Sequence, residues 1–197
     1  MSNSVKEIAI SGGIGSGKTY ICNVFEALGI PVYYSDNRAK DLVNESLELK
    51  TKIQSLLGSE SYLNGVYNTT FVTSQVFNNK SLLQKLNTII HPAVAIDYKS
   101  WVNINNHHPY LIKESAIIFE LGIEKKFHKT LLITANQDLR IDRVIKRDPW
   151  RSKSEIEAII RKQLSDSEKE KRSDYTINTN ESELILPHII KIHNSLQ

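Results

Sequence analysis

Short apolar runs alternate along the chain with longer segments in which apolar residues recur every three or four positions. The runs predict buried strands, and the longer spacing predicts helices with one buried face. The predicted strands are Val5–Ser11, Ile30–Tyr34, Tyr110–Glu114, Thr130–Ala135 and Tyr175–Asn178. The predicted helices are Lys18–Leu28, Leu42–Leu57, a stretch ending at Ile89–Pro92, Asn136–Arg147, Ser154–Glu170 and a closing helix marked by Ile185, Ile189, Ile192 and Leu196. This alternation predicts a three-layer α/β fold with a five-stranded parallel sheet.

The composition narrows the class of protein. The chain has 197 residues, a formal net charge of +3 and 40% hydrophobic residues, which suits one α/β domain without the clustered basic stripe of a nucleic-acid binder. Cys22 is the only cysteine, so the chain cannot form an internal disulfide. No signal-peptide pattern opens the sequence, and no apolar stretch approaches membrane-spanning length. We therefore expect a cytoplasmic protein that binds neither membrane nor nucleic acid. The oligomeric state is not predictable from these features.

One sequence motif indicates a specific kind of ligand binding. The segment Gly12-Gly13-Ile14-Gly15-Ser16-Gly17-Lys18-Thr19 matches G-x-x-x-x-G-K-[ST] at every fixed position, after a predicted strand and before a predicted helix. Glycines allow backbone N–H groups to turn around phosphate oxygens, and the helix N-terminus adds a positive dipole. The Lys18 ammonium can reach the β- and γ-phosphates, and the Thr19 hydroxyl can ligate Mg²⁺. The motif predicts nucleoside triphosphate binding, and a glycine-rich turn that binds nothing is the alternative.

Several kinds of P-loop protein share this motif. The Asn-Lys-x-Asp motif of GTPases is not matched by Asn136-Gln137-Asp138 after the fourth predicted strand, and ATPase motors usually need a longer chain. A helical region over 37–108 that holds an acceptor and an Arg-rich lid over 137–166 suit a small-molecule kinase that binds ATP. The remaining segments, 1–36, 109–136 and 174–197, form the expected core of a single domain. A nucleoside or nucleotide kinase and a non-catalytic nucleotide-binding module remain alternatives.

A more specific resemblance extends along nearly the whole chain. After the glycine-rich loop come Leu28-Gly29, Asp36, His91-Pro92, Ile117-Ile118-Phe119-Glu120, Gln137-x-x-Arg140-x-x-Arg143-x-x-x-Arg147-Asp148, Gln163 and Asp174-Tyr175-Thr176-Ile177-Asn178. In order and spacing these motifs resemble the dephospho-CoA kinase family. The resemblance implies ATP- and Mg²⁺-dependent phosphorylation of the ribose 3′-hydroxyl of dephospho-CoA, the last step of coenzyme A synthesis. Tyr20, Ser35 and Leu121 depart from the family pattern without removing a group that the chemistry needs.

Asp36 follows the second predicted strand, and open α/β sheets place their ligands at strand carboxyl ends. Its carboxylate can orient an acceptor hydroxyl or accept its proton. From position alone, an N-cap for the segment starting at Asn37 is an equal alternative. The family resemblance implies the catalytic, substrate-contacting role.

Arg140, Arg143 and Arg147 share one face of a predicted helix. Arginine suits polyphosphate because its guanidinium is planar and permanently charged. The alternative is a solvated basic face paired with Asp138, Asp142 and Asp148. By resemblance, Arg140 is expected to close over the γ-phosphate as a catalytic residue together with Lys18, and Arg143 to bind the nucleotide.

Other candidates rest on weaker signals. Glu114 ends the third predicted strand, where an acid can hold Mg²⁺ through water. Glu120 and His91 are candidate acceptor contacts, and Asn178 can border the adenine. For each of these four residues a purely structural role is the alternative. His107-His108 is expected to be a loop and Cys22 a small packing residue.

Overall fold

The computed structural model describes residues 5–77, 79–180 and 184–197, and the chain divides into two compact units. The core unit contains Met1–Tyr33 and Ile104–Gln197, and the helical unit contains Tyr34–Asn103. These bounds lie within a few residues of the expected division between a sheet core and the region 37–108. Residues 1–4 and 181–183 of the expected core lie outside the described part.

The core unit is built around a five-stranded sheet with the order β2-β5-β1-β6-β7. Strand β1 pairs in parallel with β5 and with β6, and β6 pairs in parallel with β7. The last four residues of β1 are buried, because a central parallel strand is covered on both faces. The strands are β1 Lys6–Ser11, β2 Val32–Tyr34, β5 Tyr110–Glu114, β6 Lys129–Thr134 and β7 Tyr175–Asn178. The expected five-stranded parallel sheet is confirmed.

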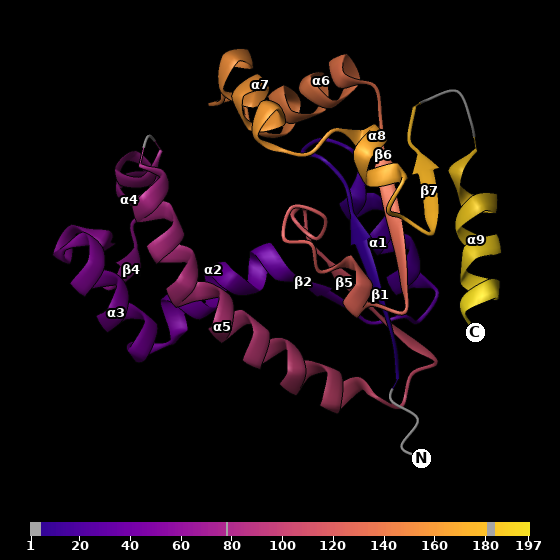
Figure 1. Cartoon of the computed structure of the whole chain (residues 1–197), viewed down its shortest axis with the longest axis horizontal. Helices are drawn as coiled ribbons and strands as arrows, with labels where there is room; N and C mark the ends of the chain where they lie inside the picture. Colours follow the sequence, from indigo (N-terminus) through magenta and orange to yellow (C-terminus); the bar gives the residue numbers. More distant parts are fainter. Residues whose placement is uncertain (1–4, 78, 181–183) are drawn as a thin grey trace. The chain divides into compact units, whose positions relative to one another are not determined.

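The helices of the core unit bury the apolar faces that the sequence spacing predicts. Helix α1 buries Ile21, Cys22 and Phe25, and α9 buries Ile189 and Leu196. These two helices contact each other, and α9 runs beside β7 (Figure 1). The helices are α1 Lys18–Ala27, α6 Gln137–Arg147, α7 Lys153–Lys162, α8 Asp166–Glu170 and α9 Ile185–Leu196, with a short 3-10 helix at Glu124–Lys126. Cys22 is the packing residue expected, and burial raises the pKa of its thiol.

The helical unit has a hydrophobic core of its own. Its buried residues are Val43, Leu49, Ile53, Tyr62, Val72 and Leu86. Asn64 and Gly65, with φ of 50° and 85°, form the turn of a small β-hairpin, as the Asn-Gly pair predicts. The elements of the helical unit are α2 Ser35–Glu45, α3 Leu47–Leu57, a 3-10 turn at Ser59–Ser61, β3 Tyr62–Leu63, β4 Val66–Tyr67, α4 Thr69–Val76 and α5 Lys80–Asn105.

Two helices differ from the sequence prediction because serine caps interrupt them. The single helix predicted over Leu42–Leu57 is wrong: Ser46 separates α2 from α3, and its hydroxyl accepts a hydrogen bond from the Leu49 N–H at 3.3 Å. The single helix predicted over Ser154–Glu170 is also wrong. It divides into α7 and α8, which begin at capping boxes formed by Ser152 with Glu155 and Ser165 with Glu168.

The helical stretch expected to end at Ile89–Pro92 continues instead. Helix α5 runs through Pro92 to Asn105. A proline inside a helix removes one backbone hydrogen bond and typically costs about 3 kcal/mol. Leu86 before the proline and Tyr98 after it are both buried, so packing on either side offsets that loss.

Within residues 5–77, 79–180 and 184–197, no helix combines the length and the apolar character that a membrane span requires.

Candidate active site

The loop of residues 12–17 joins the end of β1 to the start of α1. The strand–loop–helix context expected from the motif is therefore confirmed. Gly17 caps α1 with φ 90° and ψ 15°, a left-handed conformation that favours glycine. The first N–H groups of α1 have no partner within the helix, and they point the positive end of its dipole toward the loop. This geometry suits an anionic ligand.

Lys18, at the start of α1, holds its ammonium against the loop. Its Nζ donates to the carbonyl oxygens of Gly12 at 3.0 Å and Gly13 at 3.3 Å. It also lies 3.8 Å from Oε1 of Glu114, the last residue of β5, and the two side chains are only 12% and 10% exposed. Partial burial strengthens the field of these charges, because less water screens them. Lys18 and Glu114 thus form a partly desolvated charged pair beside the glycine loop.

Arg140, on α6, lies across the same loop. Its Nε donates to the Ile14 carbonyl at 2.9 Å, and Nη1 lies 3.2 Å from an oxygen of Asp166. Its Nη2 lies 3.4 Å from the Oε1 of Gln163. Arg140 is only 6% exposed, so it does not belong to a solvated basic face. Arg147, in contrast, is exposed and pairs with its neighbour Asp148 at 2.9 Å.

Two glycines allow Arg140 to approach the loop. A Cβ atom on Gly13 would overlap the guanidinium of Arg140, and one on Gly15 would overlap its backbone carbonyl. Gly15 also has φ 76°, which disfavours other residues. These positions are variable in the general motif, but close contact with α6 requires glycine at both.

Arg143 contacts the loop through Thr179, which follows β7. Its Nη1 donates to the Thr179 hydroxyl oxygen at 2.9 Å, and its Nη2 to the Thr179 carbonyl at 2.8 Å. The Thr179 hydroxyl lies 2.8 Å from the carbonyl oxygen of Ser16, to which it can donate. Arg143 is thereby fixed beside the end of the loop.

Two pockets open beside this loop. The first, of about 210 Å³, is lined by Gly15, Gly17, Lys18, Thr19, Arg143, Val144 and Arg147. The second, of about 560 Å³, is lined by Gly17, Tyr20, Arg143, Thr179, Asn180, Leu184, Ile185 and Leu186. The first is lined by three basic side chains and by the exposed Thr19, whereas the second is mainly apolar. Together they offer adjoining environments for a charged and a flat apolar group.

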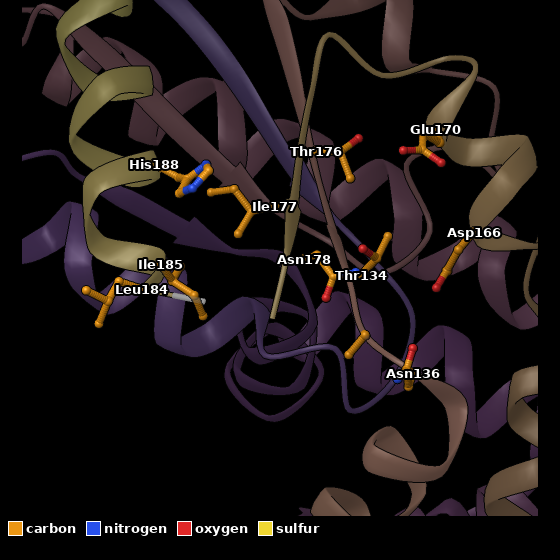
Figure 2. Close-up of a pocket in the computed structure, with 11 residues that line it drawn as sticks. Thr134, Asn136, Asp166, Glu170, Thr176, Ile177, Asn178, Leu184, Ile185 and His188 are labelled. Carbon is orange, nitrogen blue, oxygen red and sulfur yellow. The ribbon is translucent and has the colours of Figure 1, made fainter. Parts of the chain in front are cut away.

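Asn178 faces a different pocket. This pocket, of about 440 Å³, has Asp166 and Glu170 from α8 on one side and His188 from α9 on another (Figure 2). The Asn178 side-chain oxygen accepts a hydrogen bond from the Asn180 N–H at 2.8 Å. Its neighbours Thr179 and Asn180, rather than Asn178, line the apolar pocket beside Gly17.

Glu120 contacts the segment that ends the lid. Its Oε1 accepts a hydrogen bond from the Leu164 N–H at 3.1 Å and lies 2.8 Å from the Nζ of Lys169. Lys169 is fully buried on α8. A buried ammonium requires a charged partner, and Glu120 supplies it. The carboxylate therefore anchors α8 to the loop that follows β5.

The helical unit carries the other predicted residues. Asp36 lies in the first turn of α2 and is exposed, while Tyr34 occupies the N-cap position. The N-cap alternative for Asp36 is therefore wrong. An acid in the first turn is still favoured by the helix dipole. His91 is exposed on α5, and Arg38 pairs with Asp97 at 2.8 Å. His107 and His108, which belong to the core unit, lie in the turn after α5, as expected.

The donor set beside the loop suits Mg²⁺. Magnesium prefers oxygen ligands and usually keeps several of its waters. The hydroxyl of the exposed Thr19 and the Glu114 carboxylate are oxygen donors of that kind. The residues present therefore fit the metal that the motif implies.

A glycine loop follows a central parallel strand, its lysine begins the next helix, and an arginine of the lid lies across it. These features define a P-loop phosphotransferase. A family model described as "Dephospho-CoA kinase" matches residues 7–184. A dephospho-CoA kinase from Bacteroides fragilis is 31% identical over 186 residues, covering 94% of this chain and 90% of the relative. The chain belongs to the dephospho-CoA kinase family.

Solved structures show the same fold. A protein from Thermus thermophilus superimposes with a TM-score of 0.85 and 25% identity, covering 98% of this chain and 97% of that one. A dephospho-CoA kinase from Campylobacter jejuni gives a TM-score of 0.65 at 19% identity, with 98% of each chain covered.

Proposed function

We propose that this kinase transfers the γ-phosphoryl group of ATP to the ribose 3′-hydroxyl of dephospho-CoA, giving ADP and coenzyme A. The observation that carries the proposal is the position of Lys18, whose ammonium lies against the glycine loop beside the Glu114 carboxylate. Phosphoryl transfer needs mainly positioning and charge stabilisation, since the protein has little covalent chemistry to perform. Family membership adds the identity of the acceptor.

The loop and the lid share the work on the phosphates. Backbone N–H groups of Gly13, Ile14, Gly15, Ser16 and Gly17 and the Lys18 ammonium would hold the β- and γ-phosphates. Arg140, already fixed against the loop, would stabilise charge on the transferring group. Thr19 and Glu114 would hold Mg²⁺, which neutralises phosphate charge when bound.

The apolar pocket beside Gly17 is the proposed adenine site. It adjoins the phosphate loop, and Tyr20 and Leu186 give it apolar walls. Arg143 also lines it, and its planar guanidinium can stack on an aromatic base. Asn178 remains a candidate at the edge of the nucleotide site, with Thr179 between it and Arg143.

The acceptor is assigned to the helical unit. Asp36 would orient the 3′-hydroxyl or take its proton, which is worth about 10²–10⁴-fold in rate. His91, exposed on α5, is a second candidate acceptor contact. The Glu120 carboxylate contacts Lys169 and Leu164, which favours a role in anchoring the lid over direct contact with the acceptor.

The test measures ADP formation from Mg-ATP with dephospho-CoA present and absent, followed by analysis of the product for a new 3′-phosphate. Nucleosides and nucleoside monophosphates serve as competing acceptors. Turnover that requires dephospho-CoA and yields the 3′-phosphate supports the proposal. Preferred turnover of a nucleoside would favour another kinase of this scaffold, and nucleotide binding without turnover would favour a non-catalytic module.

A further inference from the structure

Ile14 is contacted by the lid through its backbone and its side chain. Its N–H donates to the Gln163 Oε1 at 3.0 Å, and its carbonyl accepts the Nε of Arg140 at 2.9 Å. Its side chain packs on a cluster formed by α6 and α7, whose buried members are Ile141, Val144 and Ile156. Residue 14, a variable position of the phosphate-loop motif, is thus held by two hydrogen bonds and one apolar contact from the lid.

Gln163 connects two of these contacts. It lies in the break between α7 and α8, and its single side-chain oxygen faces both the Ile14 N–H and the Arg140 Nη2. Asp166, three residues further on, pairs with the Nη1 of Arg140 at 3.2 Å. The side-chain oxygen of Gln163 therefore fixes the separation between the backbone of Ile14 and the guanidinium of Arg140.

We propose that Gln163 is a positioning residue that couples the lid to the phosphate loop. It accepts the Ile14 N–H and orients Arg140, so that loop and guanidinium keep one geometry when the γ-phosphoryl group is transferred. This inference rests on the proposed function. Gln163 itself need not touch the nucleotide. A displaced guanidinium stabilises the transition state less than a fixed one, so the effect falls mainly on kcat.

The decisive measurement is backbone amide exchange at Ile14 in the ¹⁵N-labelled full chain. Gln163→Leu removes the acceptor with little change in size, and Ile14 is expected to exchange at least about fivefold faster, as loss of one hydrogen bond implies. Gln163→Glu keeps an acceptor oxygen and is expected to keep the protection. Exchange at Ile8 and Ile10 in β1 should stay the same in both variants, because β1 is paired by other strands.

Kinetics supply the second readout. Gln163→Leu is expected to lower kcat about tenfold with a KM for ATP within about twofold of wild type. Gln163→Glu is expected to keep kcat within about threefold but to raise the KM for ATP, because it adds negative charge beside the phosphates. Gln75→Leu, the same substitution at an exposed glutamine of α4, is the matched control and should match wild type in both assays.

The outcomes separate the two proposals. Unchanged Ile14 exchange in Gln163→Leu, or an equal rise at Ile8 and Ile10, would overturn the coupling role, as would an unchanged kcat. If wild type shows no turnover that requires dephospho-CoA, the proposed function fails, and the amide exchange alone then decides whether Gln163 couples the lid to the loop.

Discussion

The guanidinium of Arg140 occupies the space that a side chain at position 13 would need. Most glycines of the chain have a positive φ, which disfavours other residues. The φ of Gly13 is not positive, so its backbone conformation suits other residues. Only the proximity of Arg140 therefore requires glycine there. The pair allows the position of the arginine to be changed without backbone strain.

Gly13→Ala is expected to fold normally and to displace the flexible end of Arg140. We expect kcat to fall at least about tenfold, because displacement of a charge-stabilising group by about 1 Å can cost 10²-fold. Steady-state kinetics with the proposed substrates measure the loss. In an Arg140→Ala background, the added Gly13→Ala change should cost little more. Independent, fully additive losses would show that the two residues do not act through this contact.

Asp36→Asn is expected to leave ATP binding near the wild-type value and to lower kcat at least about 100-fold, because the amide cannot take the acceptor's proton. Calorimetric titration with Mg-ATP and turnover with dephospho-CoA measure the two quantities separately. Glu60→Gln, at an exposed acid of the same unit, is the control. Near-full turnover in Asp36→Asn would exclude the catalytic role.

The sequence predicts the strands and the glycine loop well, because both depend on local patterns. The order β2-β5-β1-β6-β7 follows from packing between segments far apart in the chain, and α5 continues through Pro92 because residues on either side of the proline are buried. The break between α7 and α8 did have a local signal. Ser152-x-x-Glu155 and Ser165-x-x-Glu168 are both capping boxes.

The candidate site was only partly predictable for a related reason. Lys18 and Glu114 both lie at ends of elements that the pattern locates, and the structure brings them together at 3.8 Å. Gln163 contacts Ile14 across 149 residues of sequence, and Thr179 contacts Ser16 across 163. Asp166 contacts Arg140 across 26 residues. Short-range spacing carries no signal for such contacts.

Lys169 and Glu120 offer a test of stability. Lys169→Met leaves the Glu120 carboxylate without its ammonium partner in a largely buried setting, and we expect the free energy of unfolding to fall by about 3 kcal/mol. Urea denaturation measures the change. Glu120→Gln should be similarly destabilising, whereas the double variant should lose less than the sum of both. Additive losses would contradict coupling between the two side chains.

The Asp174 carboxyl is expected to make the free energy of unfolding depend on pH. Burial tends to raise the pKa of its carboxyl, but hydrogen bonds from the Lys129 side chain and from the Thr130 N–H and hydroxyl outweigh burial and lower the pKa. The group therefore stabilises the fold above its unfolded pKa of about 4, and this contribution is lost as the pH falls through the lower folded pKa.

The variant Asp174→Asn should therefore be less stable than wild type at pH 5–7, and the difference should shrink below about pH 4. Urea denaturation of both proteins at several pH values measures it. Asp142→Asn, at an exposed acid of α6, is the control and should show a small difference throughout. A wild-type advantage that persists undiminished at the lowest pH would contradict the assignment.

The lid contacts the phosphate loop at two points, through Arg140 on α6 and through Gln163 after α7. Neither contact depends on the length of the connection between α6 and α7. The connection between α6 and α7 can therefore accept insertions at its exposed residues Pro149 and Trp150 while the attachment points stay in register. This tip is the natural place to graft a fluorescent or affinity peptide that reports on the enzyme without entering its chemistry.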